Sequence, residues 1–206
     1  SEDELFLDLE EEDAVDDVDK DFASHLGSSS NKKKKKRKKR KKKGGRTAAN
    51  EPKEVTIRPE DQERTDRLDA WLANGAHMTR AQARNSTLLF DAASVGHLKA
   101  AKALLEKPGI RVLKENPTHP EKFTALHYAS GRGRVEVVKL LLSRPEIQVD
   151  RGQCSPLFVA ALSGQSGSVK LLLDSGADKD KADSSGSTPL LVAAHKGFAD
   201  VTKLLI

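Results

Sequence analysis

The sequence predicts an all-α solenoid of stacked helix-turn-helix units joined by hairpin loops. Two observations predict this fold: one motif recurs four times, and small and aliphatic residues keep fixed places in every copy. The copies begin at Thr87, Thr124, Ser155 and Thr188, so their spacings are 37, 31 and 33 residues. A period of about 20 to 50 residues is typical of units that each pack only on their neighbours.

Each copy begins with a short helix that presents a narrow face of small residues. The first residue is Thr or Ser, whose hydroxyl oxygen is suited to accept a hydrogen bond from a free backbone N–H. Five residues later stands an alanine in all four copies: Ala92, Ala129, Ala160 and Ala193. Nine residues after the cap stands a glycine, which ends a helix at low cost in the left-handed conformation: Gly96, Gly133, Gly164 and Gly197.

A second helix follows each glycine. In the copy at Thr124, an apolar stripe recurs at helical spacing through Val135, Val138, Leu141 and Leu142. A leucine stands seventeen residues after the cap in every copy: Leu104, Leu141, Leu172 and Leu205. Two short helices do not bury both of their apolar faces alone, so each pair needs neighbours of its own kind.

These motifs resemble the ankyrin-repeat family over residues 66–206. The last copy matches the family pattern most fully, through Asp183, Gly186, Thr188, Pro189, Leu190, Ala193, Ala194 and Gly197. The histidine that follows the leucine in the family is present only as His127, so its cross-repeat hydrogen bonds are expected in that copy. The resemblance implies a non-catalytic module that binds another protein on its concave surface and hairpin tips.

The resemblance also implies which residues meet the partner. In the family, the variable contact positions lie just before the cap and seven and eight residues after it. The matching residues here are Arg84, Ser94, Val95, Arg132, Arg151, Leu162, Ser163, Ser184, Ser185, Ser187, His195 and Lys196. Most of them are polar or basic, which favours an acidic or mixed partner surface.

The chain divides into an arm with its linker, residues 1–58, and a repeat domain, residues 59–206. We expect a capping half-repeat at 59–80 and repeats at 82–114, 119–149, 150–181 and 182–206. The last copy stops inside its second helix, so we expect further repeats after Ile206. The loop before Thr124 is four residues longer than the period and carries Pro117 and Pro120, which predicts a distorted hairpin.

The half-repeat is predicted to be one helix. Proline and two acidic residues at Pro59, Glu60 and Asp61 suit its first turn, and Gly75 is placed to end it. Because Trp71 lies 33 residues before Leu104, the helix is interpreted as the second helix of a degenerate repeat, with Trp71 in the core.

The arm begins with an acidic segment. Residues 1–21 hold twelve Asp or Glu against one Lys, with a few apolar residues between them. Burial of these few apolar residues would not offset the conformational entropy that the segment loses when it becomes ordered. We therefore expect the segment to be disordered. The segment is interpreted as a solvated tail; the alternatives are a docking segment for a partner and a segment that folds back on the basic run after it.

A run of twelve basic residues follows: Lys32, Lys33, Lys34, Lys35, Lys36, Arg37, Lys38, Lys39, Arg40, Lys41, Lys42 and Lys43. The commonest use of such a run is nuclear import through importin. RNA, ribosome or DNA contact is the next interpretation, and a membrane anchor is disfavoured because no lipidation motif accompanies the run. The sequence also has no membrane-spanning run and starts acidic, unlike a signal peptide, which predicts an intracellular protein, with the nucleus favoured over the cytoplasm.

Nothing in the sequence indicates catalysis. The histidines lack metal-ligand spacing, Cys154 is the single cysteine, and no phosphate-binding loop or nucleophile elbow occurs. We therefore expect no cofactor, no metal and no small-molecule substrate. The predicted function is a protein-protein interaction module; the alternatives are an RNA-, ribosome- or DNA-associated protein and the regulatory repeats of a larger enzyme.

Overall fold

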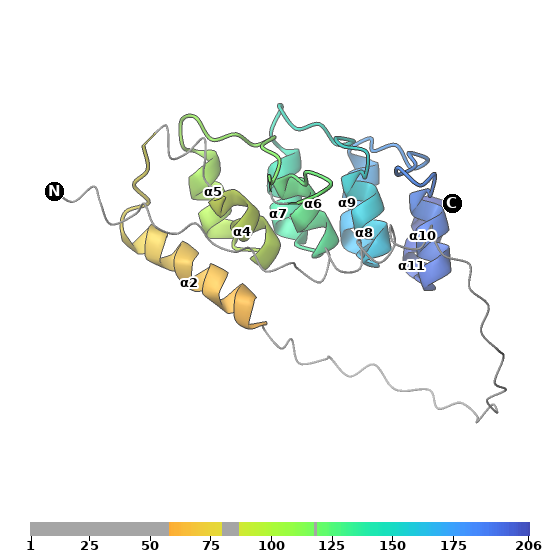
Figure 1. The fold of residues 1–206 in the computed structure, drawn as a ribbon, viewed down its shortest axis with the longest axis horizontal. Coiled ribbons are helices and arrows are strands. Elements are labelled where there is room, and N and C mark those ends of the chain that lie inside the picture. Colours follow the sequence, from red (N-terminus) through yellow and green to blue (C-terminus); the bar gives the residue numbers. More distant parts are fainter. Residues whose placement is uncertain (1–57, 80–86, 118) are drawn as a thin grey trace, which may run out of the picture.

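The structure, a computed structural model, describes residues 58–79, 87–117 and 119–206. Within these ranges every regular element is a helix, so the predicted all-α fold is confirmed. The helices are α2 (Pro59–Ala73), α4 (Leu88–Val95), α5 (Leu98–Leu105), α6 (Ala125–Gly131), α7 (Val135–Leu142), α8 (Pro156–Leu162), α9 (Ser166–Asp174), α10 (Pro189–Lys196) and α11 (Ala199–Leu205) (Figure 1). None of these helices is long and apolar enough to cross a membrane.

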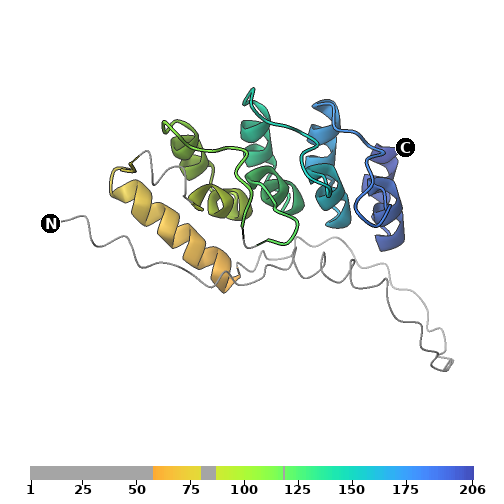
Figure 2. The ribbon, with the colours of Figure 1, turned by 45° about the horizontal axis from the view of Figure 1, so that its top comes forward.

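The helices after α2 stack as helix-turn-helix pairs. Each first helix packs on its own second helix, α4 on α5, α6 on α7, α8 on α9 and α10 on α11. The first helices also pack on one another in a row, and the second helices form a parallel row. Figures 1 and 2 show the pairs side by side, with the connecting hairpins along one edge. This is the predicted solenoid, in which each unit buries its apolar faces against its neighbours.

The repeated small and aliphatic residues form the core. The four alanines are all 0% exposed: Ala92, Ala129, Ala160 and Ala193. The four leucines of the second helices are at most 2% exposed: Leu104, Leu141, Leu172 and Leu205. Alanine lets the first helices approach closely, and leucine fills the space between the two rows. The repeat therefore reflects packing constraints that recur in each unit.

The predicted helix ends are mostly as expected. All four glycines have positive φ: Gly96, Gly133, Gly164 and Gly197. Thr124, Ser155 and Thr188 precede their helices in extended conformation, as capping residues do. The cap prediction is wrong for Thr87, which has helical angles (φ −90°, ψ −9°) and makes no side-chain cap bond. The turn already starts at this residue, so its hydroxyl is not directed at the free N–H groups.

Helix α2 covers the amino-terminal end of the stack. It begins at Pro59 and ends just before Gly75, as predicted. Trp71 is 6% exposed and belongs to the core, which confirms its predicted role. However, α2 packs mainly on the first helix α4 and only lightly on the second helix α5. It therefore does not take the second-helix position; it lies diagonally, on the edge opposite the hairpins (Figure 1).

The long loop before α6 is packed by aromatic rings. Phe123 is 0% exposed, and its ring stacks on His119 with centroids 3.8 Å apart and on His127 at 4.8 Å. The amide of Asn116 donates to the Tyr128 hydroxyl over 2.8 Å. Phe123 and Tyr128 belong to the hydrophobic core, so this loop packs against the rest of the domain.

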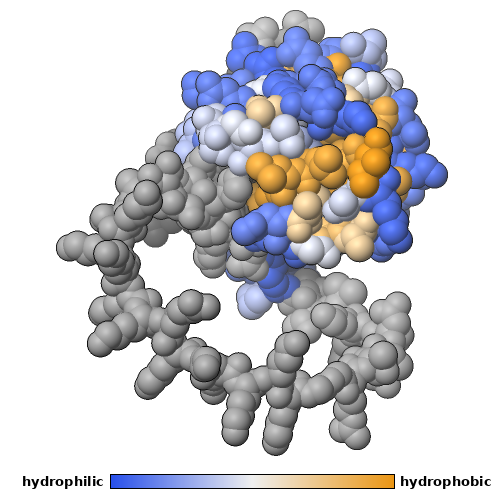
Figure 3. Space-filling view, turned by 90° about the vertical axis from the view of Figure 1, so that its right-hand side faces the viewer, coloured by the Kyte–Doolittle hydropathy of each residue, from blue (hydrophilic) through white to orange (hydrophobic). Residues whose placement is uncertain are grey.

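Apolar side chains gather on the face formed by α10 and α11. Leu191 is 58% exposed, Leu204 38% and Ile206 82%. Figure 3, which views this end of the molecule, shows the apolar surface bordered by polar residues. In the described part of the chain, these are the exposed large apolar side chains.

Candidate protein-contact surface

The structure sorts the predicted contact residues by exposure. Ser184, Ser185, His195 and Lys196 are exposed, and Val95, Arg132, Arg151, Ser163 and Ser187 are half-buried. Ser94 and Leu162 are buried, each 2% exposed. Arg84 and the basic residues 32–43 lie outside the described residues. The most accessible positions are therefore on the last hairpin and at the end of α10.

The last hairpin is held by one carboxylate. Asp183 Oδ1 accepts from the backbone N–H groups of Ser185 and Ser187 over 2.9 and 2.8 Å and from the Ser185 hydroxyl over 2.7 Å. The N–H of Asp183 donates to the Ser187 carbonyl over 2.9 Å. These bonds fix the conformation of the hairpin.

The end of α10 adds charge and apolar surface. His195 and Lys196 occupy its last turn and are exposed. Leu191, one turn earlier on the same helix, is 58% exposed. Leu191 is not one of the contact positions that the family pattern names, so sequence reasoning missed it as a contact candidate. The exposure of Leu191 depends on which side of α10 packs against other helices. The residue type alone does not indicate that side.

Arg151 borders a hollow between the loop before α6 and the loop before α8. The hollow has a volume of about 580 Å³ and is lined by Ile110, Arg111, Val112, Leu113, Lys114, Glu115, Glu146 and Arg151. Arg151 Nη2 lies 3.0 Å from Glu115 Oε1, which holds the guanidinium across the hollow. Burial and the neighbouring Arg111 lower the pKa of the Lys114 ammonium. Most of these residues lie on the long loop before α6, away from the contact positions that the family pattern names, so sequence reasoning missed them.

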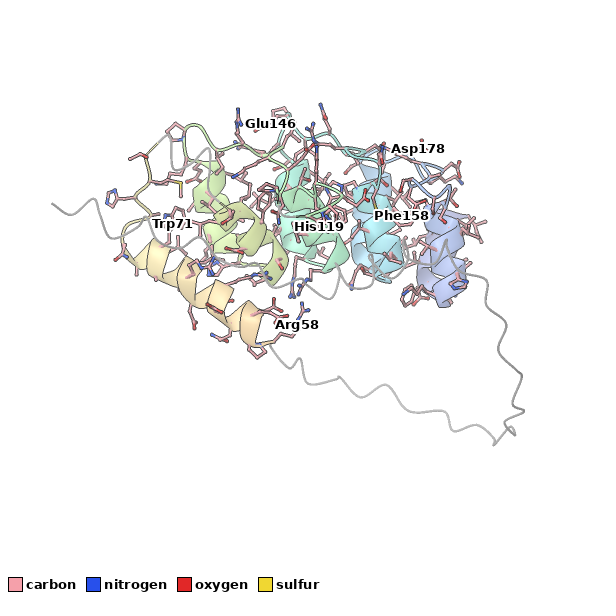
Figure 4. The ribbon with its side chains drawn as sticks, in the orientation of Figure 1. Arg58, Trp71, His119, Glu146, Phe158 and Asp178 are labelled. Carbon is pink, nitrogen blue, oxygen red and sulfur yellow. The ribbon has the colours of Figure 1, made fainter. Side chains whose placement is uncertain are left out.

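Ser94 and Arg132 are engaged by α2. Arg64 Nη1 donates to Ser94 Oγ over 3.4 Å. Arg132 Nη1 lies 3.3 Å from Asp61 Oδ1, and the Arg132 side chain is only 5% exposed. The two ends of α2 are marked by Arg58 and Trp71 in Figure 4. Over the first two repeats, the chain's own helix therefore touches positions expected to meet a partner.

His127 links the second and third repeats. Its Nε2–H donates to the Cys154 carbonyl over 2.9 Å, and its Nδ1 accepts from the Thr124 N–H over 3.0 Å. Burial lowers the pKa of this histidine to about 4, although the hydrogen bond to Cys154 opposes that shift. The neutral ring therefore supplies one donor and one acceptor, and the cross-repeat bond expected for His127 is present.

The Cys154 thiol lies in the same region. Cys154 is 3% exposed, and burial raises the pKa of its thiol far above the ordinary value. A protonated, buried thiol beside a neutral histidine does not attack a substrate. Among the described residues, no group of three His, Cys, Asp or Glu side chains is placed to hold a metal.

Comparison with known proteins places the repeats in a family. The family model described as "Ankyrin repeats (3 copies)" matches residues 63–153, 89–183 and 157–206, which together span most of the chain. The chain is 36% identical over 121 residues to a probable E3 ubiquitin-protein ligase of rice, XBOS31. It is 29% identical over 147 residues to an ankyrin repeat and KH domain-containing protein of Caenorhabditis briggsae.

These similarities cover different shares of the proteins compared. The alignment with the rice protein covers 57% of this chain and 27% of that protein, and the nematode alignment covers 70% and 6%. The chain thus spans only a small part of these relatives, and they share its repeats. Ankyrin repeats generally mediate protein-protein interaction without catalysis, although some relatives are named as enzymes. The family match, the stacked helix pairs and the recurring motif together show that the chain belongs to the ankyrin-repeat family.

Proposed function

We propose that this chain is itself non-catalytic and binds another protein along its hairpin tips and the ends of its first helices. The observation that carries this proposal is the placement of Ser184, Ser185, His195 and Lys196. They are exposed on an ordered hairpin and helix end, while the core alanines and leucines of the same repeat are buried. The fold therefore leaves these side chains available for a partner.

The chemistry of this surface indicates the partner's character. The hairpin presents hydroxyl groups, and α10 presents an imidazole and an ammonium about one turn after the exposed Leu191. Such a mixture suits a polar rim around an apolar contact. A partner segment with carboxylates beside an aliphatic or aromatic residue complements it best.

Affinity purification with charge-reversed variants tests the proposal. The combined variant Ser184→Glu, His195→Glu and Lys196→Glu should reduce recovery of specific partners at least about tenfold. The new carboxylates would repel the partner's carboxylates, and the hydrogen bonds and ion pairs of the replaced side chains would be lost. The matched control is Lys139→Glu with Lys170→Glu, exposed on the second helices α7 and α9. Equal recovery by wild type and by the hairpin and α10 variant would contradict the proposed surface.

A second proposal concerns the twelve consecutive basic residues at 32–43. We propose that this run directs the chain to the nucleus, because a dense Lys/Arg run is the usual signal for an import receptor. Replacing the run with serines should shift a fluorescent fusion out of the nucleus. Unchanged localisation with loss of salt-sensitive RNA binding would support the nucleic-acid alternative and contradict the import proposal.

A further inference from the structure

Helix α2 is held to the repeats in two different ways along its length. Its C-terminal half places Leu68 and Trp71 in the core, at 0% and 6% exposed. Its N-terminal half, residues 59–67, buries only Asp61. Because this half contributes no buried apolar side chain, the hydrophobic effect anchors α2 mainly through its second half.

The N-terminal half is attached through charges. Asp61 Oδ1 lies 3.3 Å from Arg132 Nη1 at the end of α6. Arg64 Nε lies 3.4 Å from Asp91 Oδ1 on α4, and Arg67 Nη1 lies 3.2 Å from Asp91 Oδ2. These ion pairs are partly buried, so salt screens them little, but removing either charge leaves the other without that contact; the apolar anchor does not depend on these charges.

The positions beneath this half belong to the contact surface defined above. Ser94 receives a hydrogen bond from Arg64, and the Arg132 side chain is held by Asp61. Both residues were assigned to partner contact by their place in the repeat. The surface of the first two repeats is therefore occupied by the chain itself, while the last hairpin and the end of α10 stay exposed.

We infer that residues 59–67 form a strap that occupies the contact surface of the first two repeats and detaches without the rest of α2. Leu68 and Trp71 stay in the core as the strap opens, so the domain remains folded. Opening the strap exposes the Arg132 guanidinium and removes its contact with Asp61. The partner that fits this surface is thus an acidic segment that supplies a carboxylate in place of Asp61.

Hydrogen exchange on the full chain tests the strap without any partner. In the wild type, the amides of residues 63–71, whose helical hydrogen bonds end on carbonyls of the strap, should exchange faster than those of residues 72–74. Asp61→Asn should speed exchange at 63–67 about tenfold at low salt, because it removes the charge that holds Arg132. Arg132→Gln should have the same effect, and the double variant should add little to either single change.

The matched control is Asp66→Asn. Asp66 is an exposed carboxylate on the same helix that accepts only an intrahelical hydrogen bond from Gln62 over 2.8 Å, so its loss should leave strap exchange nearly unchanged. Unchanged exchange in α7 shows that a variant is folded. The inference is overturned if residues 63–71 and residues 72–74 exchange at the same rate in the wild type, or if Asp66→Asn acts as strongly as Asp61→Asn. If the strap proposal is wrong, the proposal that the last hairpin and the end of α10 bind a partner is unaffected. If that binding proposal is wrong, the strap proposal is unaffected.

Discussion

His127 shows how a single side chain joins two repeats. It is buried, neutral and bonded on both ring nitrogens, to its own cap residue on one side and to the next repeat on the other. Its folded-state pKa of about 4 lies below the ordinary value of 6.5. The unfolded chain therefore binds a proton at this residue more readily than the folded chain between these two values.

This histidine predicts a specific pH dependence of stability. Its contribution is fully present above about pH 6.5 and is lost as the pH falls toward 4, by on the order of 3 kcal/mol. Urea unfolding of the wild type and His127→Gln should therefore give curves that converge as the pH is lowered over this range. His195→Gln, a change at an exposed histidine, should follow the wild type. Parallel curves for wild type and His127→Gln would contradict the assignment.

Two glycines with the same backbone conformation have different surroundings. Gly164 (φ +71°) and Gly197 (φ +79°) both end first helices in the left-handed region. A Cβ at Gly164 would lie 2.9 Å from the Phe198 ring of the next repeat, whereas a Cβ at Gly197 would have nothing within 4 Å. At Gly164 a larger residue would therefore meet a steric clash as well as an unfavourable backbone conformation.

We predict unequal costs for alanine at these positions. Gly197→Ala should reduce the free energy of unfolding by about 1 kcal/mol, the usual conformational cost. Gly164→Ala should cost about 1 to 3 kcal/mol more, because the Phe198 ring has to shift. Chemical denaturation of both variants measures the difference. Equal losses would mean that the ring moves freely and does not couple the third and fourth repeats.

At the scale of elements, α11 is the least enclosed second helix. It packs on α10 and α9, and Leu204 and Ile206 beside it remain exposed. We predict that its amides exchange faster than those of α7, which is enclosed by neighbours in both rows. Hydrogen exchange with fragment resolution measures this directly. Protection of α11 equal to that of α7 would show that its exposed face is covered in solution, for example by self-association.

The sequence predicted the elements well where the repeat pattern is regular. The second helices and the glycine turns could be predicted from spacing, because every unit buries the same apolar positions against its neighbours. The extended loop could not be predicted in the same way. Its structure depends on Phe123 stacking between His119 and His127, a contact among three rings that no local pattern encodes. Likewise, the spacing of Trp71 predicted its burial but not that α2 would lie across α4.

At the scale of the molecule, the contact surface was only partly predictable. The family pattern named positions by their place in a repeat, and exposure then depended on what covers each repeat. Ser94 meets Arg64 of α2, while His195 at the equivalent place in the last repeat is exposed. The pattern therefore identifies which side of a unit is free to vary, and the tertiary arrangement decides which units remain open.

The whole solenoid thus presents one occupied and one open region. The first two repeats carry α2 against Arg132, and the last hairpin and the end of α10 present hydroxyl, imidazole, ammonium and apolar groups. We propose that a protein partner binds at this open region. A binding surface is tested best by probes placed at single positions on it and away from it.

Site-specific photo-crosslinking in cells is the most direct measurement. A photoreactive amino acid placed at Ser184, His195 or Lys196 should capture the same protein from each position. Placed at Lys139 or Lys170, exposed on the second helices, it should not capture that protein. Capture of the same protein from the second helices, with none from the hairpin or α10, would contradict the claim.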